Sequence, residues 1–418
     1  MSSPTRPDLP SGLVVTAVLA GLAMIGPFTI DTIFPAFGDV GEDLDASPAA
    51  MQQVTSVYLL SFAVMSLFHG PLSDTLGRKP VMVVGLGGYV LASIGCALSP
   101  SLPVLLVFRA LQGTFAGAGT IVSRAVIRDL YEGPAAQRQM SRVMMLFSIA
   151  PAIAPVIGGW LLVWGEWPVI FWFIAGYGLV IALATGTLLP ESLPAEDRRP
   201  LRLRPLVDGM LEVGRHPAFV RLALATTFVF AAQFVYVVSA PIVVLDLLGK
   251  GERDFWMLFV PMIGGLVVGA WLAGRLAETV RADRLVDWAM RLAVVSSVVN
   301  VLLVAFAPPL PYAVIGPGLI AVSVATAFPV LQLAMLDLFP HHRGAAASLA
   351  SFASLVFNAL LAGAIAPLVT STLLVTALSS LGFAVTGLAL WTWHRSIGQR
   401  APAAPASPPA PASPPAPA

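Results

Sequence analysis

The chain has 418 residues, of which 57% are hydrophobic and 11% are charged, and its mean hydropathy is +0.85. This composition excludes a soluble enzyme, a disulfide scaffold and a disordered protein, because too few polar residues remain to cover a water-facing surface. The net charge of +1 gives no reason to expect a nucleic-acid partner, and the single cysteine, Cys96, cannot form an intramolecular disulfide or a cysteine-based metal site.

Long apolar runs with few charges recur along the chain and predict membrane-spanning helices. A span needs about 20 apolar residues, and a helix satisfies its own backbone hydrogen bonds in lipid. The first run is long for a cleaved signal sequence and eleven more follow it, so we expect a retained helix. The expected fold class is an all-α membrane protein with twelve transmembrane helices. The predicted spans are 13–37, 50–70, 80–98, 102–123, 141–163, 168–189, 219–245, 255–274, 286–307, 311–337, 345–370 and 373–394.

A polar segment divides these spans into two sets of six. We therefore expect an N-terminal half at 1–189, a cytoplasmic linker at 190–218 and a C-terminal half at 219–395. Two such halves are typical of secondary transporters, in which the substrate lies between halves that rock about it. Residues 396–418 are rich in Ala, Pro and Ser and are expected to form a disordered tail.

The positions of Lys and Arg predict the orientation of the spans. If both ends of the chain are cytoplasmic, all but three of the 23 Lys and Arg residues fall on the cytoplasmic side. Lys250 and Arg253 then lie outside, and Arg109 lies within a span. Because cytoplasmic loops carry the excess of positive charge, we expect both termini in the cytoplasm.

Asp31 lies well inside the first predicted span and Arg109 well inside the fourth. An ionisable group in a membrane is costly and is therefore a functional hypothesis by default. Both lie roughly 10 Å from the outer end of their spans, so a direct or water-bridged pairing is possible. Asp31 could bind and release protons as its solvation changes. The alternative is a permanent ion pair that only fixes helix packing.

Further residues within the spans are weaker candidates for lining a substrate cavity. Polar side chains also hold membrane helices together, and that alternative stays open for each of them. Gln112 has the better case, because it lies three residues after Arg109 and so on the same helical face. The chain has no GxxxxGK[ST] loop for ATP, no HExxH and no clustered His and Cys ligands, so we expect no cofactor and no metal. The cavity candidates are Tyr58, Phe62, Gln112, Gln233, Tyr236, Asn300, Gln332 and Asn358.

The loop between the second and third spans reads GPLSDTLGRKP and resembles the signature loop of the major facilitator superfamily. The resemblance implies that Arg78 reaches Asp129 at the end of span four. It also implies that Asp74 lies at the positive N-terminus of the helix that opens near Gly344. These contacts would latch the outward-open state, and the alternative is a solvated loop that only sets topology. The matching residues are Gly70, Asp74, Gly77, Arg78 and Lys79.

Two further motifs resemble superfamily motifs for proton coupling and export. Span four carries Arg109, Gln112 and Gly113, similar to a motif associated with proton coupling. Span five carries a proline–glycine pattern similar to that of antiporters, in which prolines bend the helix and glycines permit close contact. An ordinary kinked span is the alternative. The residues of this pattern are Pro151, Pro155, Gly158 and Gly159.

The end of span one resembles one group within the superfamily. Residues 31–36 read DTIFPA and residues 128–131 read RDLY, similar to the Bcr/CflA drug:proton antiporters. Ile33 and Gly38 stand where this group has Tyr and Pro. The resemblance covers about residues 20–190 well and is looser in the C-terminal half.

The expected function is therefore proton-driven efflux of small lipophilic drugs across the bacterial inner membrane by alternating access, and not an enzymatic reaction. The expected partners are a lipophilic substrate, protons and the lipid bilayer, and the expected functional unit is a monomer. One alternative is a proton-coupled importer or metabolite exporter of the same fold. Another, from a different class, is a non-transporting membrane sensor or scaffold.

Overall fold

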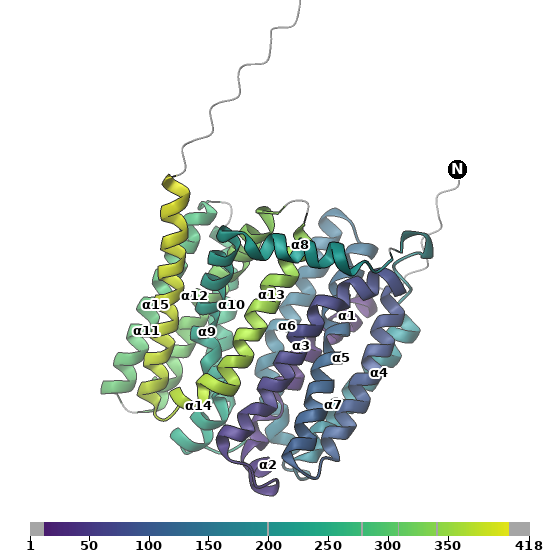
Figure 1. The fold of residues 1–418 in the computed structure, drawn as a ribbon. Coiled ribbons are helices and arrows are strands. Elements are labelled where there is room, and N and C mark those ends of the chain that lie inside the picture. Colours follow the sequence, from purple (N-terminus) through teal and green to yellow (C-terminus); the bar gives the residue numbers. More distant parts are fainter. Residues whose placement is uncertain (1–11, 199, 277–278, 308, 340–341, 401–418) are drawn as a thin grey trace, which may run out of the picture.

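The computed structural model describes residues 12–400 except 199, 277–278, 308 and 340–341. Within these residues the regular elements are helical, and the long helices run side by side as one bundle (Figure 1). Eleven helices are long and apolar enough to cross a membrane, and one bent pair, Arg138–Pro151 and Ile153–Leu161, makes up to twelve in the described part of the chain. The predicted fold class, an all-α membrane protein, is confirmed.

The first half begins with a broken span. The helix α1 ends at Asp31, a 3₁₀ turn follows at Phe34–Ala36, and α2 completes the path. The span predicted at 13–37 is present as the candidate span Leu13–Asp43, but the prediction of one continuous helix is wrong. Pro35 stands four residues after Asp31, and because it has no N–H it cannot donate the helical hydrogen bond to the Asp31 carbonyl. The helices of this half are α1 (Gly12–Asp31), α2 (Phe37–Asp43), α3 (Pro48–Leu76), α4 (Arg78–Ala97), α5 (Leu102–Leu130), α6 (Gly133–Leu161) and α7 (Pro168–Leu188).

The second half contains two helices that change pitch. The helix α9 passes into a π-helical turn at Ile242–Leu247, and α13 passes into one at Leu361–Ile365 before α14. Such turns are frequent at functional sites. The helix α15 continues past the expected end at residue 395, and residues 401–418 of the predicted tail lie outside the described residues. The helices of this half are α9 (Pro217–Val238), α10 (Trp256–Leu276), α11 (Ala282–Phe306), α12 (Pro309–Asp337), α13 (Arg343–Leu360), α14 (Ala366–Val369) and α15 (Leu373–Arg400).

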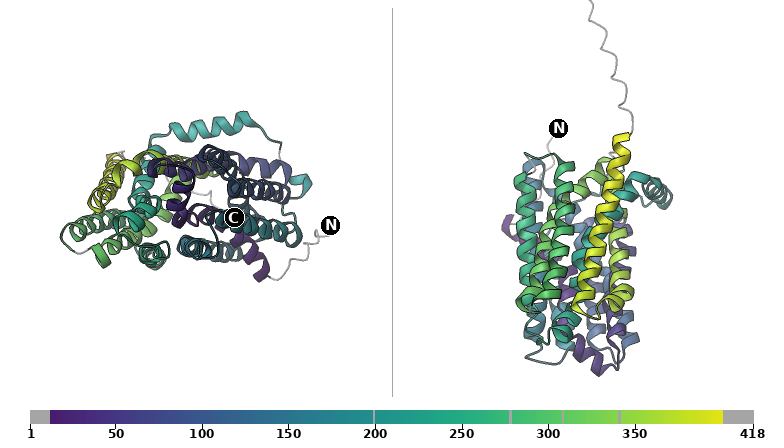
Figure 2. Two further views of the ribbon diagram at one scale, coloured as in Figure 1. Left: turned by 90° about the horizontal axis from the view of Figure 1, so that it is seen from below. Right: turned by 90° about the vertical axis from the view of Figure 1, so that its left-hand side faces the viewer.

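The two ends of the bundle carry different elements. One end, here called the linker end, carries α8 (Leu203–Arg215), which runs outside the bundle from one half to the other (Figures 1 and 2). The opposite end, here called the α2 end, carries α2 and the connection between α9 and α10 (Figure 1).

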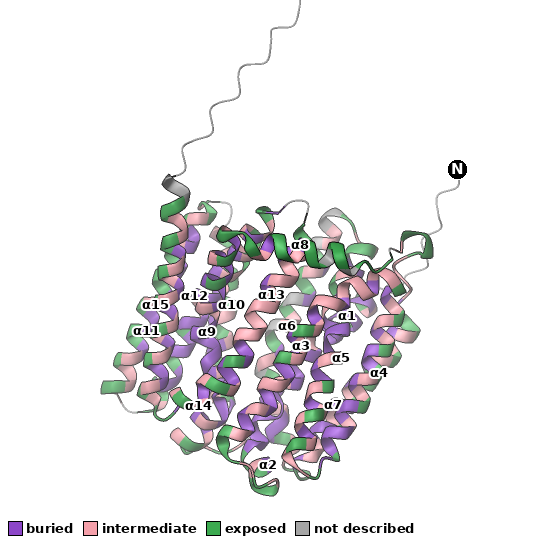
Figure 3. Cartoon of the chain, in the orientation of Figure 1, coloured by how far each residue is buried: buried purple, intermediate pink, exposed green. Residues whose placement is uncertain are grey.

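Exposed residues recur along the outer helices of the bundle (Figure 3), and many of them are apolar. Val84 is 72% exposed, Leu183 60% and Phe306 85%, and each belongs to a candidate span. Exposed apolar surface on this scale marks contact with an apolar environment, which for helices of this length is lipid.

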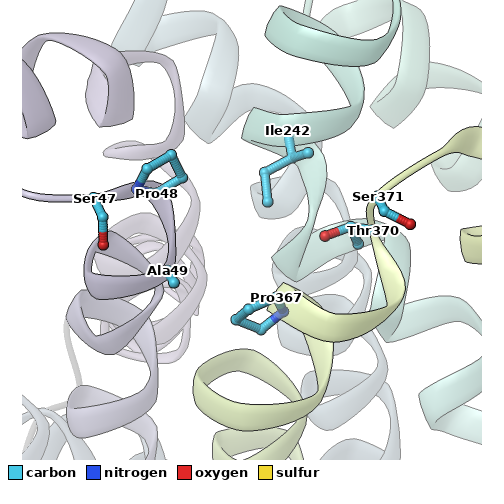
Figure 4. A pocket seen from close by; sticks show the side chains of 7 residues that line it. All are labelled: Ser47, Pro48, Ala49, Ile242, Pro367, Thr370 and Ser371. Atoms are coloured by element: carbon cyan, nitrogen blue, oxygen red, sulfur yellow. The ribbon is translucent and has the colours of Figure 1, made fainter.

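The halves are joined near the α2 end. Gln53 Nε2 donates to the Gly363 carbonyl at 2.8 Å, and Ser56 Oγ donates to the Ala359 carbonyl at 2.8 Å. Among the described residues, these are the hydrogen bonds that cross from one half to the other. A hollow of about 310 Å³ lies between the halves at the same end (Figure 4). Its lining residues are Ser47, Pro48, Ala49, Ile242, Pro367, Thr370 and Ser371.

Candidate functional site

Asp31 is the last residue of α1 and is only 3% exposed. Its Oδ1 atom is buried and has no hydrogen-bond partner among the residues that the structure describes. The same holds for the hydroxyl of Thr32, the first residue of the break in α1. Buried polar groups are normally hydrogen-bonded, so the break provides unsatisfied groups that a proton, a water molecule or a ligand can satisfy.

The guanidinium group of Arg109 is fully buried and is held by oxygen atoms from three helices. Nε donates to the Val54 carbonyl of α3 at 3.0 Å. Nη1 donates to the Thr29 carbonyl of α1 at 3.1 Å and to Gln112 Oε1 of α5 at 2.8 Å. The Tyr58 ring covers one face, 4.7 Å from Cζ. Arg109 therefore joins α1, α3 and α5 where they meet.

Arg109 and Asp31 form no hydrogen bond or ion pair in the described part of the chain, so the direct pairing considered from the sequence is absent. The geometry of α1 gives the reason. Arg109 binds α1 at Thr29, whose hydroxyl is bonded to Tyr89 of α4. Asp31 follows two residues later, a rotation of about 200° in a helix of 3.6 residues per turn. Its side chain therefore lies on the opposite side of α1 from α4.

Three of the predicted cavity residues are bonded within one half instead. Gln112 accepts from Arg109 and donates through Nε2 to Ser93 Oγ of α4 at 2.8 Å, inside the first half. Asn300 Nδ2 donates to the Tyr236 hydroxyl at 2.6 Å, inside the second half. These residues hold helices together, which was the alternative interpretation of their sequence pattern.

Other predicted cavity residues keep groups that a ligand can bind. The Tyr58 hydroxyl, Gln233 Oε1 and Asn358 Oδ1 are buried and have no partner among the described residues. Phe62 stacks on Tyr58 with ring centroids 6.2 Å apart, and Gln332 is half-buried.

Sequence reasoning missed Gln52, whose amide oxygen and nitrogen are both buried without a partner in the described chain. Gln52 stands in the first turn of the predicted second span, which begins at residue 50, and no role was predicted for it. The structure buries Gln52, because α2 and the π-helical turn at Leu361–Ile365 pack against α3. A polar residue in the first turn of a predicted span is the only sequence signal for it.

The glycines of the predicted antiporter motif lie where α6 meets the α2 end. A Cβ atom at Gly158 would overlap the carbonyl of Thr32, in the break of α1. A Cβ atom at Gly159 would overlap the carbonyl of Glu252, in the connection between α9 and α10. Upstream, α6 bends by 44° between Pro151 and Ile153. The bend lies in the turn before Pro155, which cannot donate the helical hydrogen bond to the Pro151 carbonyl. The motif thus places α6 in close contact with both halves.

Glu252 lies outside the spans at this contact between the halves. Burial raises the pKa of its carboxyl group, the Asp39 carboxylate of the first half raises it further, and Arg253 lowers it. Two like charges from opposite halves therefore come together at the α2 end, and protonation of Glu252 favours this arrangement.

The signature loop turns at Gly77, whose φ of 100° lies in the left-handed region that glycine adopts freely. Arg78 Nε donates to Asp129 Oδ2 at 2.9 Å, which is the contact that the family resemblance implied. Asp74 pairs with Arg78 at 2.6 Å. Among the described residues no hydrogen bond joins Asp74 to the start of α13, so the implied position beside Gly344 is not found in this arrangement.

Glu191, just after α7, contacts the signature loop and was not assigned a role from the sequence. Its Oε1 accepts from the backbone N–H of Arg78 at 3.0 Å, and its Oε2 accepts from that of Lys79 at 3.3 Å. Arg198 lies 3.7 Å from Glu191 Oε2. The carboxylate satisfies the free N–H groups at the N-terminus of α4. An acid directly after the sixth predicted span, on the same side as the loop, is the sequence signal for this contact.

Residues 17–362 match the model of the Major Facilitator Superfamily. The chain belongs to this superfamily. It is therefore a multi-pass membrane transporter rather than an enzyme. The chain is 29% identical over 352 residues to the MFS-type transporter YdgK of Bacillus subtilis, and the match covers 83% of this chain and 87% of YdgK.

Two other relatives are named for drug resistance. The chain is 29% identical over 280 residues to a bicyclomycin resistance protein homolog of Haemophilus influenzae, covering 67% of this chain and 70% of the relative. It is 28% identical over 341 residues to the multidrug resistance protein MdtL of Vibrio parahaemolyticus, covering 81% and 85%. These names agree with the resemblance of residues 31–36 to the Bcr/CflA group.

Solved transporters share the fold. A bacterial homolog of the human lysosomal transporter Spinster, in an inward-facing and unoccupied conformation, has a TM-score of 0.70 at 16% identity, covering 92% of this chain and 96% of that one. A D-xylose–proton symporter has a TM-score of 0.70 at 13% identity, covering 91% and 97%.

Proposed function

We propose that this transporter exports small lipophilic compounds across the bacterial inner membrane in exchange for protons. The observation that carries the proposal is Asp31, a buried carboxyl group with an unpartnered oxygen at the break of α1. Asp31 lies one residue from the contact between Thr32 and Gly158, so a movement of α6 at the α2 end acts directly on its surroundings. The drug-resistance names of two relatives support the choice of cargo.

In this proposal the linker end and both termini face the cytoplasm, and the protein works as a monomer without a nucleic-acid partner. The linker end carries most of the arginines, whereas the α2 end carries acids such as Asp39, Asp43 and Glu252. Positive charge is enriched on the cytoplasmic side of membrane proteins. The hydrogen bonds between the halves near the α2 end then belong to an arrangement closed toward the outside.

Protons reach Asp31 from the outside while the α2 end is open. When the end closes, α6 packs against Thr32 and water is removed from the break of α1. Burial without a neighbouring cation favours the neutral form of a carboxyl group, so the proton is retained. Substrate that enters from the cytoplasm promotes proton release by direct competition or by preferring the other arrangement, because coupling requires only unequal binding to the two arrangements.

Arg109 acts in this proposal as a positioning residue. It binds the Thr29 carbonyl and holds the last turn of α1 against α3 and α5, which places Asp31 at the break. The signature loop has a separate role as a latch at the linker end. With the α2 end closed, Asp74 pairs with Arg78, and in the opposite arrangement Asp74 would bind the start of α13 near Gly344.

The proposed cargo is lipophilic because aromatic rings gather between the helices of the second half. Phe228, Phe357 and Phe383 form a cluster in the second half with ring centroids 5.0 to 6.2 Å apart. A few unpartnered polar groups can orient a cargo molecule among such rings. The proposed lining residues are Tyr58, Phe62, Gln233, Gln332 and Asn358.

Transport in proteoliposomes with an imposed pH gradient tests the proposal. The wild type is expected to move a lipophilic cation such as ethidium against the direction of proton flow. Asp31→Asn should lose gradient-driven transport but keep the exchange of labelled for unlabelled ethidium. Asp45→Asn, an exposed acid just after α2 whose positive φ Asn also adopts, is the matched control and should keep both.

Each outcome separates the proposal from its alternatives. Wild-type rates for Asp31→Asn in the pH gradient would remove the proton role of Asp31. Accumulation on the side to which protons move would identify an importer. No transport of any compound from a drug-susceptibility panel in a pump-deficient host would favour a sensor or scaffold.

A further inference from the structure

The helix α8 lies against the side of the bundle at the linker end, outside both halves in both views (Figure 2). Its inner face packs on α13. A Cβ atom at Gly209 would lie 3.6 Å from His342 Nδ1, and one at Gly214 would lie 3.1 Å from Leu349 Cδ2. Leu349 is roughly 9 Å along α13 from the first residue of that span. The helix α8 therefore lies at the level where a membrane span begins, not beyond it in water.

One stripe of α8 faces away from the protein. It contains Arg204, Val207, Leu211 and Arg215, which share a helical face by their spacing of three and four residues. The exposed Asp208, four residues after Arg204, lies on the same face. Val207 is 49% exposed and Leu211 is 46% exposed, whereas Val213 on the inner face is fully buried. A surface helix with an exposed apolar centre flanked by arginines has the pattern of helices that lie in a membrane interface.

The arginines of this region have no carboxylate partner. Within the described residues, Arg202, Arg204 and Arg215 form no ion pair. Glu191 lies beside Arg198 and Glu212 lies 3.7 Å from His342, while the exposed Asp208, four residues after Arg204, forms no ion pair with it. Exposed guanidinium groups at the depth of lipid headgroups bind phosphate, often through two parallel hydrogen bonds. Their long side chains also reach the headgroups while their methylene groups cover apolar surface.

We propose that α8 is an interfacial helix that binds anionic phospholipid headgroups at the linker-end surface of the bilayer. Val207 and Leu211 enter the boundary between headgroups and acyl chains, and Arg204 and Arg215 bind headgroup phosphates beside them. The depth of α8 against α13 selects lipid over a soluble protein as the occupant, because a bilayer around the apolar bundle must reach this level. The inference depends on the membrane location and is independent of the cargo or the proton.

A depth measurement on the full-length protein tests the apolar part. In a Cys96→Ser background, Leu211→Cys and its matched neighbour Glu212→Cys are labelled with bimane and reconstituted in vesicles of brominated phosphatidylcholine. The label at 211 should be quenched by the brominated lipid and protected from iodide, and the label at 212 should show the reverse. Equal iodide quenching at both positions, without lipid quenching at 211, would overturn the proposal.

A lipid competition tests the charged part. The protein is purified from vesicles of equal phosphatidylglycerol and phosphatidylcholine, and the lipids that remain bound are counted by native mass spectrometry. Arg204→Gln with Arg215→Gln should reduce the retained phosphatidylglycerol ratio by about fivefold for each arginine at low ionic strength. Asp208→Asn with Glu212→Gln, on the same helix, should leave or raise it. A wild-type ratio in the arginine variant, or an equal loss in both variants, would refute headgroup binding by this stripe.

Discussion

The two hydrogen bonds between the halves should hold the α2 end closed, and their removal should populate an open arrangement. Gln53→Ala and Ser56→Ala together delete the donors to the Gly363 and Ala359 carbonyls, both at 2.8 Å. Each bond contributes about 1 kcal/mol net, so the double variant should lose about 2 kcal/mol of preference for the closed arrangement. A change of this size shifts the closed-to-open ratio roughly 30-fold.

Electron–electron distance measurements across the hollow report this ratio. In a Cys96→Ser background, spin labels at Ala49→Cys and Ser371→Cys lie on opposite sides of the hollow (Figure 4). The double variant should show a second, longer distance that is nearly absent in the wild type. Ser61→Ala is the matched control, because the Ser61 hydroxyl bonds only to carbonyls of its own helix, and it should leave the distances unchanged.

The reasoning would be refuted by a double variant whose distance distribution equals that of the wild type. Each single variant should give an intermediate population if the two bonds act independently. A longer distance in the Ser61→Ala control would mean that the labels report local changes in α3 instead of separation of the halves.

Three further predictions follow from the same structure. Gly159→Val should prevent closure of the α2 end and lengthen the same label distance, because the valine side chain would overlap the Glu252 carbonyl. Gly176→Val is the control: no atom lies within 4 Å of a Cβ at this position, so the distance should not change. The pKa of Glu252 is raised, so the closed arrangement binds the Glu252 proton more tightly and a lower pH should favour closure. Glu252→Gln should abolish that part of the pH dependence of the label distance. Arg78→Gln should lower the free energy of unfolding by about 1–3 kcal/mol, because the 2.9 Å bond to the partly buried Asp129 is lost. The midpoint of thermal unfolding should fall, and an unchanged midpoint would contradict a stabilising role.

The fold class followed from the sequence because the membrane imposes a one-dimensional rule. A spanning helix needs a run of apolar residues of a certain length, and such runs can be counted without knowing what they pack against. The break at Asp31 was missed although its cause is local. Pro35 removes the hydrogen bond to the Asp31 carbonyl, but prolines inside spans are common and do not always end a helix: Pro261 lies within the continuous α10.

The sequence predicted which residues belong to the candidate site, but not which of them contact one another. Asp31 and Arg109 were singled out because charges inside spans are rare, and their similar depth suggested a pair. Depth along a helix says nothing about rotation around it. The structure turns Asp31 away from the face on which Thr29 meets Arg109, and it gives Arg109 backbone carbonyls as partners in place of a carboxylate.

The sequence by itself determined that this protein is a membrane transporter of two helical halves, because apolar length is a property of the chain alone. The contact between Arg78 and Asp129 was implied by the resemblance of a short motif to the superfamily's signature loop, and the structure contains it. Only the tertiary structure decided which atoms meet between segments distant in sequence. The overlap of Gly159 with the Glu252 carbonyl, the acid that caps α4 and the outward stripe of α8 all depend on the rotation and neighbours of each helix. Those quantities are set by packing in three dimensions, and the order of residues along one helix does not encode them.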